Sequence, residues 1–204
     1  MEIQLPLYKM KISDTDEGEE EVDWVALVQS PAIQRNFLAF NDQQVKATIV
    51  QRFAIQDEEQ QIVTGPLMIA DLPIYRKDDN GEYYVVFGAE EIKKIVQRFF
   101  KKGYQNQVNI EHDAPTSGVY MYESYIVDRG LGVMPPKGYE DVADGSWFGT
   151  FKIDNEKVWE LVKNGTFKGF SVEGLFRYEI AEQHITHEEL MMSKIIEILQ
   201  QIEH

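Results

Sequence analysis

The stretch Lys163–Phe176, KNGTFKGFSVEGLF, sets a single serine in an apolar, strand-like run with glycines on both sides. Glycines in such a run remove side-chain bulk, so a neighbouring backbone or a substrate can approach closely. Alternation with a period of two gives this strand two distinct faces. One face carries Phe167, Gly169, Ser171 and Glu173, and the other carries Phe170 and Val172.

Ser171 is the candidate nucleophile of this strand. A serine hydroxyl of ordinary acidity is a weak nucleophile and needs a base within hydrogen-bond reach. Among the four histidines of the chain, His112 is the candidate base, because it ends a second strand-like run, QVNIEH. Alternation predicts that Val108, Ile110 and His112 share the apolar face of that strand, with Asn109, Glu111 and Asp113 on the other.

Both side chains also have a plainer interpretation. A serine on a strand commonly bonds its hydroxyl to nearby backbone. A lone histidine on an apolar face is usually a buried, neutral imidazole with a satisfied hydrogen bond. The sequence alone therefore leaves two interpretations open: Ser171 and His112 form a catalytic pair, or each has only a structural role.

Length and composition narrow the class of protein. The 204 residues, 43% of them hydrophobic, suffice for one domain with a full core. A net charge of −15 argues against a nucleic-acid partner, which requires Lys and Arg to replace counterions on phosphate. The absence of cysteine excludes disulfides, thiolate catalysis and Cys-bound zinc. With no signal-like N-terminus and no long apolar run, the sequence predicts a cytoplasmic soluble protein without a membrane partner.

The order of elements indicates an α+β, mostly β chain. A helix over residues 89–102 follows from helical spacing of apolar residues, with acids at its start and Gly103 at its end. A second helix, 156–163, has Asp154 as its expected N-cap, and a third is expected from Ile180 onward. Strands are expected at 3–12 (an edge strand), 22–28, 45–55, 62–70, 74–75, 83–87, 107–112, 119–127, 147–153 and around Ser171, with exposed loops at 13–21 and 128–146. Without βαβ alternation, this predicts a mostly antiparallel barrel or sandwich decorated by helices.

The ordered set of motifs over about residues 20 to 177 resembles the phage prohead (capsid maturation) serine proteases of the XkdF-like branch. The matching runs are VDWVALV (22–28) with SPA (30–32), TGPL (64–67), DLPIYR (71–76), EYYVV (82–86), NIEHD (109–113), GVY (118–120), ESYIV (123–127), GSW (145–147) and GFSVEG (169–174).

That resemblance implies a helix-decorated antiparallel β-barrel similar to herpesvirus assemblin. It implies a serine endopeptidase with Ser171 as nucleophile and His112 as general base, and no cofactor or metal. The substrates would be scaffold and the major capsid protein inside the immature procapsid, in the host cytoplasm, with self-cleavage and a homo-oligomer left open. The protease domain would span residues 1–179, and residues 180–204 would form a helical tail towards scaffold-like sequence.

The third catalytic residue is less well defined. We expect Glu123, because Val119, Met121 and Glu123 on the returning strand share a face that one register would align with His112. Asp113 directly follows His112 and should point the other way. Glu179, Glu182 and His184 stay open as alternatives, and Arg129 or Arg177 could assist backbone N–H groups in stabilising an oxyanion.

Two rival functions remain at this point. The same fold could serve as a non-catalytic structural protein of a capsid or scaffold assembly, with the C-terminal helix binding a partner. Alternatively, His184, His187 and Glu188 could hold a metal in a hydrolase, although H-x-x-H-E is not the H-E-x-x-H motif and more often marks a solvated helix face.

Overall fold

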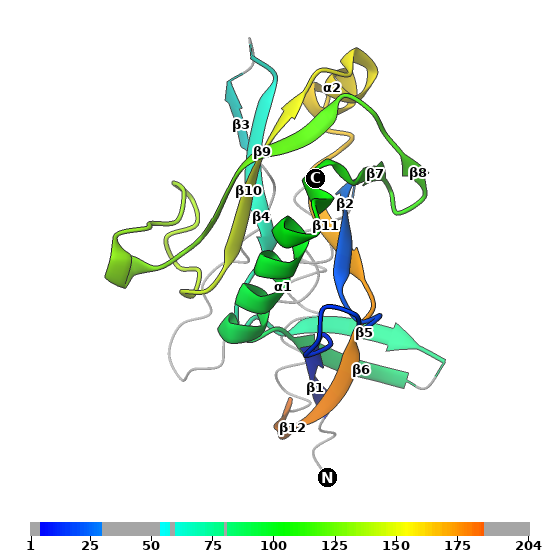
Figure 1. The fold of residues 1–204 in the computed structure, drawn as a ribbon, viewed down its shortest axis with the longest axis vertical. Helices are drawn as coiled ribbons and strands as arrows, with labels where there is room; N and C mark the ends of the chain where they lie inside the picture. Colours follow the sequence, from blue (N-terminus) through cyan, green and yellow to red (C-terminus); the bar gives the residue numbers. More distant parts are fainter. Residues whose placement is uncertain (1–4, 30–53, 58–59, 80, 186–204) are drawn as a thin grey trace, which may run out of the picture.

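The computed structural model describes residues 5–29, 54–57, 60–79 and 81–185 of the chain. The described part is α+β and mostly β, as expected (Figure 1). Its strands are β1 (Leu5–Lys11), β2 (Val22–Val28), β3 (Ala54–Asp57), β4 (Ile62–Met68), β5 (Ile74–Asp78), β6 (Gly81–Val86), β7 (Val108–Ile110), β8 (Ala114–Pro115), β9 (Val119–Ile126), β10 (Trp147–Ile153), β11 (Gly169–Gly174) and β12 (Arg177–Ile185). Its helices are α1 (Ala89–Lys101), α2 (Glu156–Lys163) and the 3₁₀ turns Tyr104–Asn106 and Arg129–Leu131.

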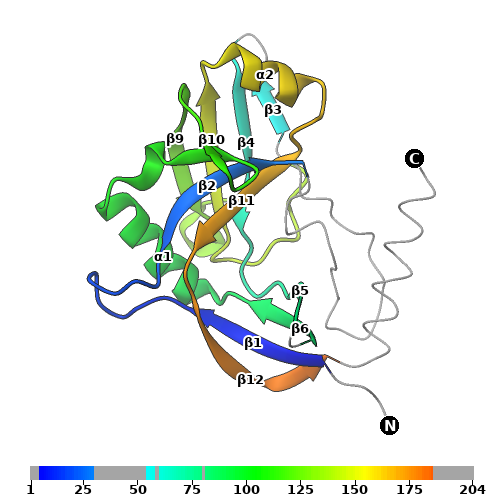
Figure 2. The same ribbon diagram turned by 90° about the vertical axis from the view of Figure 1, so that its right-hand side faces the viewer.

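The strands form three four-stranded sheets, in the orders β12-β1-β6-β5, β3-β4-β10-β9 and β11-β2-β7-β8. Most pairings are antiparallel, but β1 pairs with β6, and β2 with β7, in parallel. The sheets of the described residues are separate and do not join into one closed barrel. Figures 1 and 2 show the first sheet beneath the other two, and the core includes side chains from β2 and β11 together with side chains from β4.

Helix α1 forms where the sequence predicts it, because its apolar stripe has a core to face. Ile92, Ile95 and Phe99 are buried in the main core, together with side chains from all three sheets. The C-terminal half of α1 also holds the acidic loop 13–21, since Arg98 donates to the carbonyls of Ser13 and Glu20. The loop is therefore anchored to the helix rather than simply solvated.

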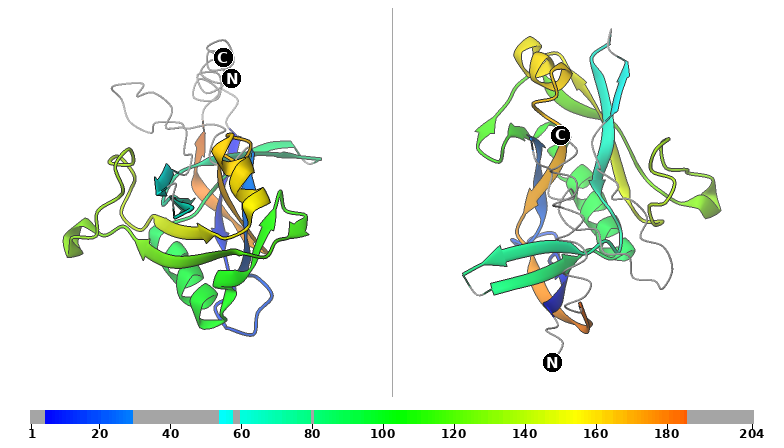
Figure 3. Two further views of the ribbon diagram at one scale, coloured as in Figure 1. Left: turned by 90° about the horizontal axis from the view of Figure 1, so that it is seen from above. Right: turned by 180° about the vertical axis from the view of Figure 1, so that it is seen from behind.

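The core also fixes the strand that carries Ser171. Phe170 is 1% exposed and its ring lies 4.4 Å from that of Phe151 on β10, centroid to centroid. Because side chains alternate along a strand, burying Phe170 turns Ser171 to the opposite face of β11. In Figure 3 the long connection between β9 and β10, residues 128–146, projects away from this core.

Three element predictions need correction. The N-terminal strand β1 is internal to its sheet, because β12 and β6 flank it on either side. Residues 180–185 belong to strand β12, paired antiparallel with β1, so the helix expected from Ile180 does not begin there. Asn155, not Asp154, caps α2: its side chain accepts hydrogen bonds from the N–H groups of Lys157 and Val158. The rest of the expected tail, 186–204, lies outside the described residues.

Candidate active site

Three neighbouring strands place the candidate nucleophile in line with a buried amide. On β11, Ser171 pairs with Ala26 of β2, and Ala26 pairs in turn with Asn109 of β7. Adjacent strands lie about 4.8 Å apart, so Ser171 and Asn109 are separated by only about 10 Å of sheet. Ala26 between them carries only a methyl group. Side chains from the two outer strands can therefore meet above it.

His112 lies in a tight turn, not on a strand. Strand β7 ends at Ile110, and the chain reverses at once into β8, with Asp113 N–H donating to the Ile110 carbonyl at 3.0 Å. Glu111 and His112 both have left-handed backbone, with φ of 52° and 61°. The prediction that His112 sits on an apolar strand face is wrong, because the turn swings the imidazole to a half-exposed position, 41% accessible.

Two consecutive left-handed residues that are not glycine carry a conformational cost of about 1–2 kcal/mol each. The surrounding contacts hold this geometry in place. The backbone N–H of Glu111 donates to the Leu27 carbonyl at 3.1 Å, and the Glu111 carboxylate accepts from the Gln29 N–H at 2.6 Å. Strained backbone of this kind is most common at functional sites, where the surrounding structure holds a costly conformation in place.

A carboxylate meets the imidazole. His112 Nδ1 lies 2.9 Å from Glu173 Oε1, and the Glu173 side chain is 28% exposed. The side-chain amide of Asn109 donates to the same Glu173 oxygen. Asn109 is itself buried, so this polar contact is held by the sheet rather than by a mobile surface chain. Glu173 is thus held from one side by an amide and contacts a histidine on the other.

The spacing along β11 suits an imidazole bridge between Glu173 and Ser171. Both residues are on the same face, and residues two apart on a strand are separated by about 6.8 Å. A histidine that makes one hydrogen bond of about 2.8 Å at each ring nitrogen spans a similar distance. Ser171 is partly exposed and lines a pocket, and its side chain makes no hydrogen bond to the described residues.

Glu123, the expected third catalytic residue, lies on β9, in a different sheet from Ser171. Its carboxylate accepts a hydrogen bond from Thr150 at 2.8 Å, in the sheet that contains β9 and β10. The pairing passes from Phe151–Met121 to Thr150–Glu123 and skips Tyr122, which is the mark of a β-bulge. The bulge puts Glu123 on the face opposite to buried Met121. The shared face that we expected for Val119, Met121 and Glu123 is therefore lost.

The two arginines and the described downstream residues named from the sequence lie on other parts of the structure. Arg129 binds Asp144 and the carbonyls of Glu140 and Val142 within the 128–146 loop. Arg177 donates to the Ile12 carbonyl. Both arginines are thus occupied away from Ser171. Glu179, Glu182 and His184 lie on β12, which pairs with β1, and His187 and Glu188 lie outside the described residues.

A further carboxylate, Asp23, lies on the strand that pairs with β11. Asp23 lies on β2, one residue before the Trp24 that pairs with Glu173. Burial raises the pKa of Asp23, and the carboxylates of Glu21 and Glu173 raise it further.

The described residues contain no group of three or more His, Cys, Asp or Glu side chains placed to hold a metal ion. None of the helices in the described ranges is long and apolar enough to cross a membrane.

These observations define the class: a mostly β protein of the α+β type with a histidine–carboxylate pair in the same face of a sheet as a strand serine. The chain belongs to the family described as Putative phage serine protease XkdF, whose model matches residues 49–179. That range contains His112, Ser171 and Glu173.

A curated relative agrees with this assignment. The phage-like element PBSX protein XkdF of Bacillus subtilis (strain 168) is 28% identical over 119 residues, which cover 58% of this chain and 38% of the relative. The chain thus spans well under two thirds of the relative's length. No solved structure matches the chain.

Sequence reasoning missed Asn109 and Glu173 as parts of the site. Alternation assigns Glu173 to the face of Ser171, and this was the available signal. Alternation assigns Asn109 to the face opposite His112. That assignment requires His112 to be a strand residue, and it lies in a turn instead. The contact depends on the pairing of β11 with β2 and β7, which joins residues 64 positions apart.

Proposed function

We propose that this protein is a serine endopeptidase in which Ser171 is the nucleophile, His112 the general base and Glu173 the residue that orients His112. Glu173 takes the role that sequence alone gave to Glu123. The observation that carries the proposal is the 2.9 Å contact between His112 Nδ1 and Glu173 Oε1, on the face of β11 that also carries Ser171. The family's name supports the same class of chemistry.

The chemistry follows from this arrangement. A carboxylate at Nδ1 keeps the proton on that nitrogen and leaves Nε2 as the base. Nε2 takes the Ser171 proton while Oγ attacks the peptide carbonyl carbon. The tetrahedral intermediate collapses, the C–N bond breaks and His112 gives the proton to the leaving amine. Water, deprotonated by His112, then attacks the acyl ester and releases Ser171 and the new carboxyl terminus.

The substrates in this proposal are scaffold and the major capsid protein of a phage prohead, cleaved inside the immature shell in the host cytoplasm, with the enzyme's own tail as a further target. The phage names of the family and of the relative support this setting. The proposal includes a fold relationship to the assemblin barrel. It is supported by mostly antiparallel sheets packed around one core, with α1 against them.

The test is co-expression with the scaffold and capsid proteins of the same phage, with cleavage read by mass spectrometry. The wild type should process at least one of them, and Ser171→Ala and His112→Ala should each abolish processing, because loss of a triad member costs orders of magnitude in rate. Thermal unfolding should show that both variants are folded. Processing that continues in both folded variants contradicts the proposal.

A structural role without turnover is the second candidate, and one observation favours it. On the projecting 128–146 loop, Leu131 is 80% and Met134 60% exposed, which suits a contact with another protein. Under this candidate the wild type cleaves nothing, and Leu131→Ser with Met134→Ser impairs assembly. The co-expression experiment separates the two, since the protease proposal requires cleavage products.

A further inference from the structure

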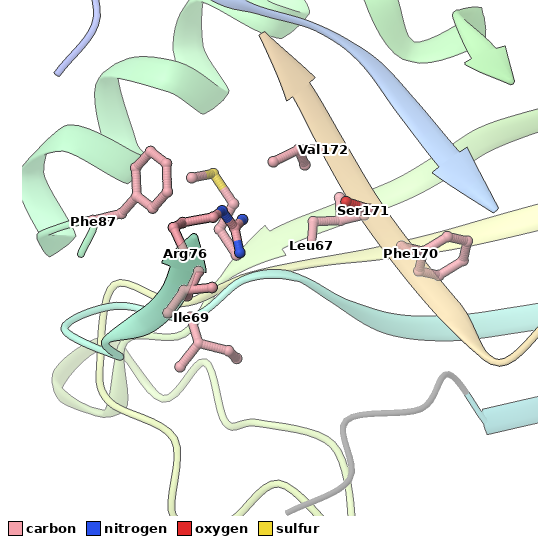
Figure 4. Close-up of a pocket in the computed structure, with 9 residues that line it drawn as sticks. Leu67, Ile69, Arg76, Phe87, Phe170, Ser171 and Val172 are labelled. Carbon is pink, nitrogen blue, oxygen red and sulfur yellow. The ribbon is translucent and has the colours of Figure 1, made fainter. Parts of the chain in front are cut away.

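A small pocket opens beside Ser171. It lies where the end of β4, strand β5 and the edge of β11 meet, and Ser171 is one of its lining residues (Figure 4). Its volume is about 40 Å³. A water-sized atom needs about 10–15 Å³ in such a measure, so the pocket has room for about three, the size of a carboxylate group.

The lining is apolar except for Ser171 and one cation. Leu67, Phe87 and Val172 are among the apolar side chains, and Arg76 supplies the charge. Figure 4 shows the Arg76 side chain extending from β5 towards β11, across the pocket that Ser171 lines. A side chain that enters this pocket from a substrate bound at Ser171 would therefore meet apolar walls and a guanidinium.

Arg76 has no anionic partner in the part of the chain that is described. Its one hydrogen bond runs from Nη1 to the carbonyl of the adjacent Tyr75, at 3.0 Å. By contrast the next residue, Lys77, pairs with Glu82 at 3.3 Å. Arg76 is partly buried, and this burial lowers the pKa of its guanidinium. A partly desolvated cation without a counter-charge strongly favours an incoming anion.

We propose, resting on the endopeptidase function above, that this pocket is the subsite for an acidic substrate side chain next to the scissile bond, and that Arg76 is the residue that selects it. A guanidinium offers a planar pair of donors that matches a carboxylate better than a lysine does. Glutamate or aspartate in the substrate would satisfy these donors, whereas glutamine or lysine would leave the cation unpaired.

The test is a peptide library incubated with the wild-type protein, with cleavage positions read by mass spectrometry. One position beside the cleaved bond should be enriched in Glu and Asp. In a fluorogenic peptide with that sequence, changing the acid to its amide should lower kcat/KM by about ten- to a hundredfold, the usual effect of losing one hydrogen bond between charged groups.

Variants assign the preference to Arg76. Arg76→Met should bring the acid-to-amide ratio of kcat/KM close to one, Arg76→Lys should keep part of it, and Arg76→Glu should favour lysine at that position. Lys77→Met is the matched control, because it removes the neighbouring cation on the same strand, outside the pocket lining, and should keep the wild-type ratio. An unchanged ratio in folded Arg76→Met overturns the inference, as does an equal loss on the acid and amide peptides.

A fluorophosphonate that labels reactive serines separates this inference from the proposed function. Labelling of wild-type Ser171 without any acidic preference in the library overturns the role of Arg76 and leaves the protease in place. Absence of both labelling and cleavage overturns the protease itself. The library uses the wild-type protein, so the inference can be refuted even if an Arg76 variant fails to fold.

Discussion

Among single residues, the acid that contacts His112 is the first to test. Glu173 contacts the imidazole, and Glu123 contacts Thr150 in another sheet. Each acid can be neutralised with little change of shape by its amide. The pair of substitutions therefore forms a matched comparison.

Glu173→Gln should lower kcat for peptide cleavage by about 10²- to 10⁴-fold, because an amide at this position no longer favours the productive tautomer or stabilises the imidazolium. Glu123→Gln should stay within about threefold of wild type. The measurement is initial rates on one fluorogenic peptide, with both variants checked for folding. A large loss for Glu123→Gln with none for Glu173→Gln would restore the original assignment.

Asp23 gives a second prediction at this scale, concerning stability. Burial raises its pKa in the folded state above the ordinary value of 3.8, so the folded protein binds this proton more tightly than the unfolded chain. Its contribution to stability is therefore full below the unfolded pKa and is lost as pH rises through the folded pKa.

Asp23→Asn removes the ionisable group and with it the loss of stability at high pH. At pH 7 it should raise the free energy of unfolding by a few tenths of a kcal/mol, a size typical of a partly exposed position. The gain should shrink towards pH 3.5. Melting temperature against pH tests it, with Asp79→Asn, which removes an exposed carboxylate, as the control. A gain that grows on acidification contradicts the assignment.

At the scale of elements, the close approach of β11 to β2 holds Glu173 in position. A Cβ atom added at Gly174 would lie 2.8 Å from Val22 Cα and would collide with the Glu21 carbonyl oxygen. A methyl group at this position must push the end of β11 away from β2. Glu173 is the adjacent residue and would move with it.

Gly174→Ala should therefore destabilise the fold by about 1–3 kcal/mol, the usual cost of overpacking. It should also lower cleavage more than its effect on folding explains. Denaturant unfolding and initial rates measure the two effects. Gly88→Ala is the control, because the nearest atom to its added Cβ would be 3.8 Å away. Wild-type stability and rate in Gly174→Ala would show that β11 tolerates the displacement.

Elements that are specified by residues close together in the chain could be predicted from the sequence. The candidate site could be predicted only in part. Helix α1 and the β5–β6 hairpin follow from apolar spacing and turn residues close by in the chain. The turn at His112 could not be predicted, because its two left-handed residues are Glu111 and His112. A glycine normally occupies such a position and signals the turn. The bulge at Tyr122 and the register of β11 on β2 are set by long-range packing, which alternation along one strand does not contain.

At the scale of the whole molecule, three sheets and α1 share one core, and the candidate site lies on the sheet β11-β2-β7-β8. The chemistry proposed there uses no metal ion. Cleavage should persist unchanged in a strong chelator of divalent metals. A loss of activity that added zinc restores would instead support the metal hydrolase built on His184, His187 and Glu188.

The most direct test of the Ser171–His112–Glu173 assignment is fluorophosphonate labelling of the purified protein, mapped by tandem mass spectrometry. The account predicts phosphonylation of Ser171 in the wild type, its loss in His112→Ala, and a strongly reduced rate in Glu173→Gln. An unlabelled Ser171 in folded wild-type protein, or equal labelling in His112→Ala, would contradict it.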